Sequence, residues 1–325
     1  MEAGLDLVVS ILAATLRVAT PLILAALAGL FAERAGVVDV GLEGKMLAGA
    51  FAAAATAAVT GSVWMGLGAA ILASGALALI HALACVTLRG SQVVSGMAIN
   101  VLASGLTATL AIAWFRMGGQ TPPLPQSARF PPLPLPGAET IGQIPVLGRL
   151  LVSVVGGHTA PVYLALALVP LASFLLWRTR FGLRLRACGE NPGAVDAAGI
   201  SVARLRYAGV MIAGLLCGVA GAAIATAQGA GFGTDMTAGR GFIALAALIL
   251  GAWKPWPVLA TCLAFGLLDA IAIRMQGVLI PGLGVAFPVQ AVQALPYVLT
   301  VILLAGFVGR AVAPRAAGVP YVKER

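Results

Sequence analysis

The chain has 325 residues, of which 60% are hydrophobic and 10% are charged, and its mean hydropathy is +1.02. So few charges cannot cover a soluble surface, and several apolar runs are long enough to cross a lipid bilayer. The composition therefore excludes a soluble globular protein and predicts an all-α polytopic membrane protein. The net charge of +9 does not indicate nucleic-acid binding, because the basic residues sit in loops and chain ends, where they set orientation and meet anionic lipid.

The residues that carry chemistry form no catalytic or metal-binding pattern. The four cysteines are scattered, without a CxxC pair or paired histidines nearby, so neither a metal site nor a disulfide framework is indicated. HExxH, GxSxG and the ATP-binding GxxxxGK[ST] loop are absent from the sequence. The sequence thus predicts a protein that is not an enzyme and holds no cofactor. Transport driven by ATP would need a separate nucleotidase.

Nine membrane spans are expected, within a range of eight to ten because short half-helices blur the count. They cover residues 7–31, 47–60, 65–88, 92–115, 163–177, 207–228, the half-span 242–252, 258–273 and 289–307. The first span contains Arg17 and Pro21, which indicates a helix inside the bundle rather than against lipid. The second, third and sixth spans are rich in alanine and glycine, which predicts close helix packing.

The segment AERAGVVDVGLEGK, residues 32–45, places Glu33, Arg34, Asp39 and Glu43 among three glycines. Glycines this dense between apolar flanks let the chain unwind, which at membrane depth is tolerated only against protein or a water-filled cavity. The alternative is a cytoplasmic turn between two spans, since charged turns at the membrane surface are common.

Polar side chains also occur inside two of the spans. Asn100 and Ser104 lie one helical turn apart on one face of the fourth span, where they can bond to other helices or line a polar path. His81 in the third span is expected to be a packing or interfacial histidine, because no carboxylate accompanies it in the sequence.

Residues 116–157 form a loop rather than a span, and TPPLPQSARFPPLPLP within it has seven prolines in sixteen residues. That composition favours extended backbone and excludes helix, which predicts a long exposed loop. The span that follows leads into a basic loop, so the proline-rich loop is expected outside the cell. It is either a contact surface for an extracytoplasmic partner or a passive linker.

The loop at residues 178–206 carries six arginines against Glu190 and Asp196. Basic residues next to spans are retained in the cytoplasm, so this loop is expected on the cytoplasmic side. Asn191 is a suitable N-cap, Pro192 suits a first helical position and Gly199 suits a helix end, which together predict a short helix. Such a helix can dock into a groove of a partner, or the loop is an ordinary solvated connector.

The segment AQGAGFGTDMTAGRG, residues 227–241, resembles residues 32–45. When the two segments are aligned with an offset of 195 residues, Lys45 matches Arg240, and Asp39 lies one position away from Asp235. Each copy follows a span and precedes a small-residue helix, and the span count places the two copies on opposite sides. This layout predicts two inverted repeats with broken half-helices, although a chance match between two Gly/Ala-rich segments is the alternative.

The last third of the chain supplies membrane anchors and a tail. WKPWP, with Trp253, Lys254 and Trp256, suits a membrane interface, and Asp269 in the following span should face protein or a cavity. We expect one transmembrane domain over 1–325, with repeats at about 7–115 and 207–310, the external loop 116–157, the basic loop 178–206 and a cytoplasmic tail 311–325. The N-terminus is then outside.

Three segments together resemble a known family: GLFAERAGVVDVGLEGKMLAGAF, RLRACGENPGAVDAAGISVARLR and AGLLCGVAGA. They are similar to the membrane permease subunits of bacterial ABC importers for simple sugars and nucleosides, the group that includes ribose and branched-chain amino acid permeases. The ERAGVVDVGLEG form resembles the nucleoside-type branch most. The resemblance covers nearly the whole chain.

The resemblance implies partners and sites that the residues alone do not. It implies a second permease subunit in a heterodimer, two cytoplasmic ATP-binding subunits, an extracytoplasmic binding protein and a bacterial inner-membrane location. It also implies a coupling helix, formed by Gly189, Glu190, Asn191, Pro192, Ala197, Ala198 and Gly199. Nucleosides are neutral and polar, so the path should offer hydrogen bonds; the candidates are Asp39, Glu43, Asn100, Ser104, Thr234 and Asp235.

Two other classes of function stay open at this point. An ion-coupled secondary transporter or channel could use Asp39, Glu43 and Asp269 as ion or proton sites. A membrane scaffold without transport is the weaker alternative, because a scaffold has little use for glycine-broken polar segments at membrane depth. Between a nucleoside and a sugar as substrate, only the family resemblance decides.

Overall fold

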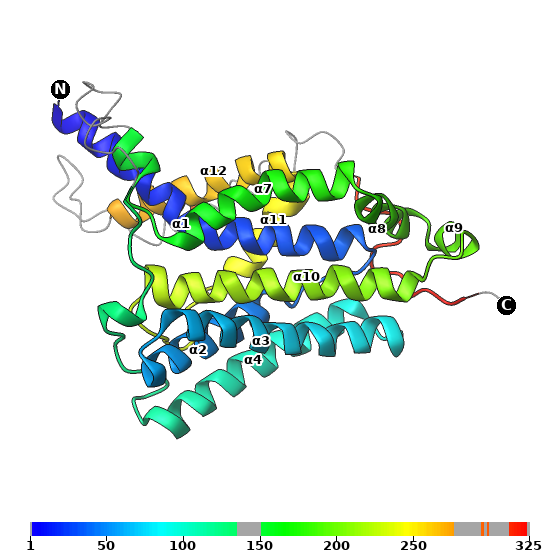
Figure 1. Cartoon of the computed structure of the whole chain (residues 1–325), viewed down its shortest axis with the longest axis horizontal. Helices are drawn as coiled ribbons and strands as arrows, with labels where there is room; N and C mark the ends of the chain where they lie inside the picture. The colour runs from blue at the N-terminus through cyan, green and yellow to red at the C-terminus, as the bar shows by residue number, and fades with distance from the viewer. Residues whose placement is uncertain (1, 135–150, 276–293, 296–297, 299–311, 324–325) are drawn as a thin grey trace.

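A computed structural model describes residues 2–134, 151–275, 294–295, 298 and 312–323 of the chain. Within these residues the fold is a helical bundle with no strand beyond two isolated bridges. Figure 1 shows that α1 and α7 begin at the end of the bundle that carries the N-terminus, whereas α8, α9 and the C-terminus lie at the opposite end. The predicted ninth span, 289–307, lies almost entirely outside the described residues.

The helices follow the predicted spans closely, which confirms the all-α polytopic class. Their bounds are α1 Glu2–Arg34, α2 Leu42–Thr60, α3 Val63–Ala82, α4 Gln92–Phe115, α7 Ala160–Arg178, α8 Arg180–Glu190, α9 Pro192–Ala197, α10 Val202–Ala222, α11 Arg240–Leu250 and α12 Pro255–Arg274. Single π-helical turns extend α3 to Thr87 and α10 to Gln228. In the described residues seven helices are long and apolar enough to cross a membrane, and α11 is a shorter apolar helix.

The helix α1 runs through the interior of the bundle from Ala19 onward, as Pro21 predicted, whereas Arg17 is exposed. Nearly every side chain from Ala19 to Ala35 is buried, and α1 packs against α7, α10, α11 and α12. Pro21 has no N–H to donate to the carbonyl of Arg17 four residues earlier. The side chain of Gln228 supplies that missing bond, with Nε2 donating to the Arg17 carbonyl at 2.6 Å.

Small residues bring α2, α3 and α10 into close contact, which confirms the packing predicted from their composition. A Cβ on Gly221 would lie 2.2 Å from the carbonyl oxygen of Met46 in α2, and one on Gly218 would lie 2.7 Å from that of Ala70 in α3. A Cβ added to Gly214 would lie 2.4 Å from the Cβ of Ala78, so a larger residue does not fit at this position either. Lipid supplies little drive for helices to associate, so this fit of backbone to backbone holds the bundle together.

Two local expectations need correction. The basic loop is expected to hold one short helix, but a second helix, α8, fills most of its first half, and Thr179 caps it by accepting from the Gly182 N–H. In the WKPWP segment, Trp256 is exposed, whereas Trp253 is buried against the end of α1, where its Nε1 donates to Glu33 Oε2 at 2.5 Å.

The second correction concerns the proline-rich segment, which is not simply an exposed loop. Thr121, Leu124 and Phe130 are buried. Their backbone N–H groups donate to carbonyl oxygens of Phe232, Ala230 and Thr226, at 3.1, 2.8 and 3.0 Å. Prolines cannot donate such bonds, but the residues between them can, so the segment lies against the chain that leaves α10.

Candidate functional site

The starts of α2 and α11 meet inside the bundle, although 196 residues separate the groups that join them. Glu43 in the first turn of α2 accepts hydrogen bonds from the backbone N–H groups of Gly239, at 2.8 Å, and Gly241, at 2.6 Å. The first N–H groups of a helix have no partner within it, and the helix dipole favours a negative charge there. Glu43 therefore caps α11, and this contact ties the two glycine-rich breaks, residues 35–41 and 229–239, to each other.

The first break is sealed around a buried ion pair. Lys45 Nζ lies 2.5 Å from Asp39 Oδ2, and both side chains are fully buried. His81 approaches the same carboxylate, with Nε2 at 3.9 Å from Asp39 Oδ1, so the expectation that no carboxylate accompanies this histidine was wrong. A buried charge persists only when it is paired, so Lys45 is what allows Asp39 to sit here.

Side chains of α4 hold the backbone of this first break in place. Gln92 Oε1 accepts from the Val38 N–H at 2.6 Å. Asn100 accepts from the Gly44 N–H at 2.8 Å through Oδ1 and donates to the Val40 carbonyl at 3.0 Å through Nδ2. Two of the predicted path residues, Asn100 and Glu43, therefore cap the starts of α2 and α11. A third, Asp39, is paired with Lys45 and has no exposed surface.

The second break is open where the first is sealed. Ser104 Oγ donates to Asp235 Oδ1 at 2.9 Å, and both Thr234 and Asp235 are exposed. Asp235 has a φ of +53°, a left-handed conformation that is uncommon for a residue with a side chain. Val101, an exposed apolar residue of α4, lies one turn before Ser104 on the same face of the helix. Polar groups on such a face need water or a protein partner, because lipid would leave them without hydrogen bonds.

The other candidate site lies at the opposite end of the bundle, where α9 stands apart from it (Figure 1). Asn191 Oδ1 accepts from the Ala194 N–H at 3.1 Å, Pro192 is the first helical residue and Gly199 has a φ of +75°, which confirms the predicted short helix. Ala197, Ala198 and Gly199 are exposed, and Val195 is the buried anchor.

Gly189 and Glu190, predicted with this helix, instead end α8. A Cβ on Gly189 would lie 2.4 Å from the Arg34 carbonyl oxygen, so this glycine allows α8 to touch the end of α1. Glu190 forms an ion pair with Arg34 at 3.9 Å. Cys188 is buried beside them, and burial raises the pKa of its thiol although the nearby Arg206 guanidinium lowers it. These groups fix the position of α9 from one side.

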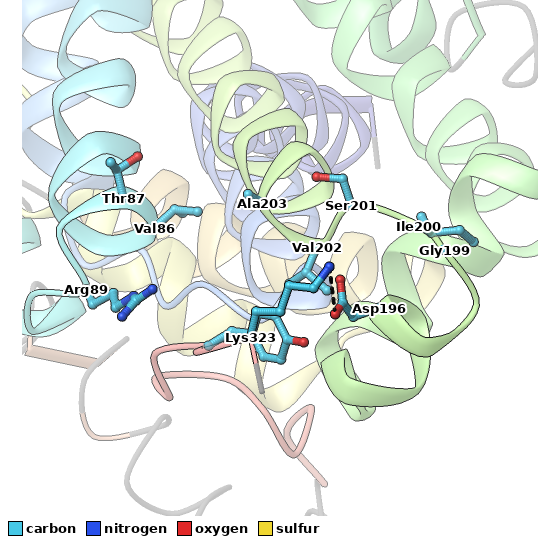
Figure 2. Close-up of a pocket in the computed structure, with 11 residues that line it drawn as sticks. Val86, Thr87, Arg89, Asp196, Gly199, Ile200, Ser201, Val202, Ala203 and Lys323 are labelled. Carbon is cyan, nitrogen blue, oxygen red and sulfur yellow. Dashed lines mark ion pairs between the residues drawn. The ribbon is translucent and has the colours of Figure 1, made fainter. Parts of the chain in front are cut away.

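The chain near its C-terminus holds α9 from the other side, which the sequence did not reveal. Ala316 N–H donates to the Gly189 carbonyl at 2.8 Å, Arg206 Nη1 donates to the Val319 carbonyl at 3.0 Å and Lys323 pairs with Asp196 at 3.5 Å. Between this segment, α9 and the end of α3 lies a pocket of about 390 Å³, and Figure 2 shows the Lys323–Asp196 pair at its edge.

Long apolar helices around two helix breaks that meet inside the bundle are the architecture of a membrane transport protein. The sequence profile of the branched-chain amino acid transport system/permease component family matches residues 11–307. The chain belongs to this family.

Full-length relatives agree with the profile. The guanosine ABC transporter permease protein NupQ of Bacillus subtilis is 44% identical over 320 residues, with 96% of each chain covered. The nucleoside ABC transporter permease protein NupC of Lactococcus lactis is 39% identical over 312 residues, with 94% of each covered. TsgC13 of Haloferax volcanii, an ABC transporter permease whose name gives glucose as a provisional substrate, is 35% identical over 94% of each chain.

The chain is thus a transmembrane permease subunit of an ABC transporter and a multi-pass membrane protein. It is a transport component and not an enzyme. Membership in the family implies ATP-binding and substrate-binding partners. The alternative of an ion-coupled secondary transporter is not favoured, and Asp39 and Glu43, which it would need as ion sites, are occupied by Lys45 and by the start of α11.

Proposed function

We propose that this permease imports nucleosides. The proposal is supported by NupQ and NupC, whose names give guanosine and nucleosides as substrates and whose sequences match the chain over nearly its full length. The relative named for glucose makes a sugar the second candidate, at lower identity. A neutral polar solute requires hydrogen-bonding groups and no strong ionic site, and the Ser104–Asp235 pair with Thr234 offers such groups.

The translocation path in this proposal runs along the face that carries Ser104, Thr234 and Asp235. That face is completed by a second, related permease subunit, so that the pair forms a heterodimer. The exposure of polar groups beside bare apolar residues of α4 supports this, because such a surface gains from a protein partner. Asp39, Glu43 and Asn100 act as positioning residues that hold the breaks.

The inverted repeats in this proposal are about 7–115 and 207–310. Rocking of one repeat against the other opens the path to each side in turn. The single observation that carries this mechanism is that Glu43 of the first break caps the helix that follows the second. Movement of one break is therefore transmitted to the other.

The driving force enters through α9 in this proposal. Two ATP-binding subunits contact the coupling helix from the cytoplasm, and the exposed residues Asn191, Ala197 and Ala198 are its contact surface. The basic residues around α8 and α9 and in the tail support a cytoplasmic position for this end. An extracytoplasmic binding protein delivers the substrate at the other end, and the complex resides in the bacterial inner membrane.

Uptake measurements with coupling variants test the proposal. We expect Glu190→Lys and Pro192→Gly to abolish ATP-driven uptake of radiolabelled guanosine in proteoliposomes that contain all partner subunits, while both variants still reach the membrane. Glu190→Lys places a cation beside Arg34, and Pro192→Gly loosens the first turn of α9. Normal uptake in both variants would contradict the coupling role. Uptake by the lone chain under an ion gradient would contradict the proposal as a whole.

A further inference from the structure

A second polar site lies away from the path, in a cavity of about 340 Å³ between α1, α7, α10, α11 and α12. Its polar lining consists of Arg17, Thr20, Thr159, Gln228 and Arg240. The rest of the lining is apolar, and none of the described residues that line it is acidic. Two guanidinium groups therefore share one cavity, and the described residues of its walls carry no negative charge.

Neither arginine is neutralised by the described part of the chain. Arg17 is exposed and its guanidinium forms no hydrogen bond or ion pair there. Arg240 is half-buried and has one long hydrogen bond, from Nη1 to Gln228 Oε1 at 3.4 Å. The nearest carboxylates are Asp269, which forms no ion pair with it among the described residues, and Glu43, whose two oxygens are already used in capping α11.

Gln228 fixes the two arginine-bearing segments relative to each other. Its Nε2 donates to the carbonyl of Arg17 in α1, while its Oε1 accepts from Arg240 at the start of α11. The first bond replaces one that Pro21 prevents in α1, so the orientation of the amide is set by the fold. Gln228 consequently holds the backbone segments that carry the two arginines in place around the cavity.

The cavity lies at the boundary of the apolar part of the bundle. Thr159 directly precedes the first residue of α7, Gln228 ends the extended α10 and Ile273 is next to the last residue of α12. Three membrane-spanning helices thus begin or end at its wall, at the end of the bundle opposite α9. Arg17 precedes Arg34 by seventeen positions in α1, or about 26 Å at the helical rise, which is close to the roughly 30 Å of hydrocarbon in a bilayer.

We propose that this cavity binds the phosphate group of a membrane phospholipid, with Arg17 and Arg240 as its cationic donors. Arginine recognises phosphate through paired N–H groups, and charge-assisted bonds of this kind are the stronger class. The depth of the cavity matches the level of lipid headgroups, and the exposed side chain of Ile273 at its wall can meet the acyl chains. The bound lipid supplies an anion that pairs with the two arginines, neither of which forms an ion pair with the described residues.

Thermal unfolding of the purified transporter, stripped of lipid in detergent, tests this assignment. We expect phosphatidylglycerol and phosphatidylcholine to raise the unfolding midpoint of the permease in a saturable way, and diacylglycerol, which lacks phosphate, to leave it unchanged. Arg17→Gln should weaken the apparent affinity for phosphatidylglycerol roughly tenfold or more, because it removes a charge-assisted contact. Arg17→Lys keeps the charge without the paired N–H groups, so its affinity should be intermediate.

The matched control is Arg116→Gln, which removes an exposed arginine at the end of α4, on the same side of the bundle but outside the cavity. Its lipid response should equal that of the wild type. Equal protection by diacylglycerol, or an unchanged response in Arg17→Gln, would overturn the phosphate site. Full protection by low millimolar sodium phosphate alone would overturn the lipid as its source. None of these outcomes depends on which solute the permease imports.

Discussion

The two glycine-rich breaks have the same layout and opposite surroundings. Each leads from the end of a long helix into a helix that starts inside the bundle, α2 after the first and α11 after the second. In the first, the acidic residue Asp39 is paired with Lys45 and fully buried. In the second, the acidic residue Asp235 is exposed, and among the described residues its carboxylate is hydrogen-bonded only to the hydroxyl of Ser104.

The two breaks differ in how their polar groups are satisfied. Around the first break, Gln92 and Asn100 bond to backbone groups, and the Asp39 carboxylate is closed to solvent beside Lys45. Around the second, Thr234 and Asp235 are exposed. In the proposed mechanism the first break is therefore an anchor, and the second offers hydrogen-bonding groups to the solute. Glu43 joins them.

The largest expected effect is the loss of the charge that seals the first break. Lys45→Met leaves the Asp39 carboxylate buried without its partner, and breaking a buried pair from one side costs about 3–5 kcal/mol. We expect a large drop in the thermal unfolding midpoint of the detergent-purified permease and a low yield from membranes. The double variant Asp39→Asn with Lys45→Met should recover much of this loss, because no unpaired charge remains. A single variant as stable as the wild type would show that Asp39 is not sealed.

The next effect should come from the contact between the breaks. Glu43→Ala leaves the N–H groups of Gly239 and Gly241 without their acceptors, and loss of a helix cap costs roughly 0.5–2 kcal/mol. We expect a moderate loss of stability and a much larger loss of nucleoside uptake, because the two breaks no longer move together.

Glu43→Gln is the matched control for this contact. The amide keeps one oxygen acceptor and the same length, but its NH2 group cannot accept the second N–H. Stability and uptake should therefore each fall less than in Glu43→Ala. Uptake in Glu43→Ala that falls only in proportion to the amount of folded protein would contradict a role in joining the breaks.

Much of the fold could be predicted from the sequence, because spans in lipid are long apolar runs and local signals end them. The Asn191–Pro192 start of α9 is a local signal of this kind and was found. The contact of Glu43 with α11 could not be predicted, since it joins groups 196 residues apart in sequence. Pro21 did offer a signal in the sequence. Because it has no N–H, the backbone carbonyl of Arg17 needs a hydrogen-bond donor from another part of the chain, and Gln228 is that donor.

The candidate site was predicted less well, because residue type does not determine exposure. Six polar residues were selected for the path, and the structure divides them by surroundings. The cation that pairs with Asp39 is Lys45, which lies near the start of α2, directly after the loop that carries Asp39. Asn100 and Ser104 share a face of α4 as predicted, but one meets a helix start and the other meets the open break.

Variants of Asn100 and Ser104 should show the smallest effects. They should also separate an effect on the stability of the permease from an effect on transport. Asn100→Ala removes two hydrogen bonds from the first break, at about 1 kcal/mol each, so it should lower the unfolding midpoint. Ser104→Ala removes one bond to an exposed carboxylate and should change stability by less than about 0.5 kcal/mol. Its effect should appear instead as a raised KM for nucleoside uptake in proteoliposomes, since the hydroxyl faces the proposed path. If Ser104→Ala left the KM unchanged while Asn100→Ala raised it at equal protein amount, the roles of the two breaks would have to be exchanged.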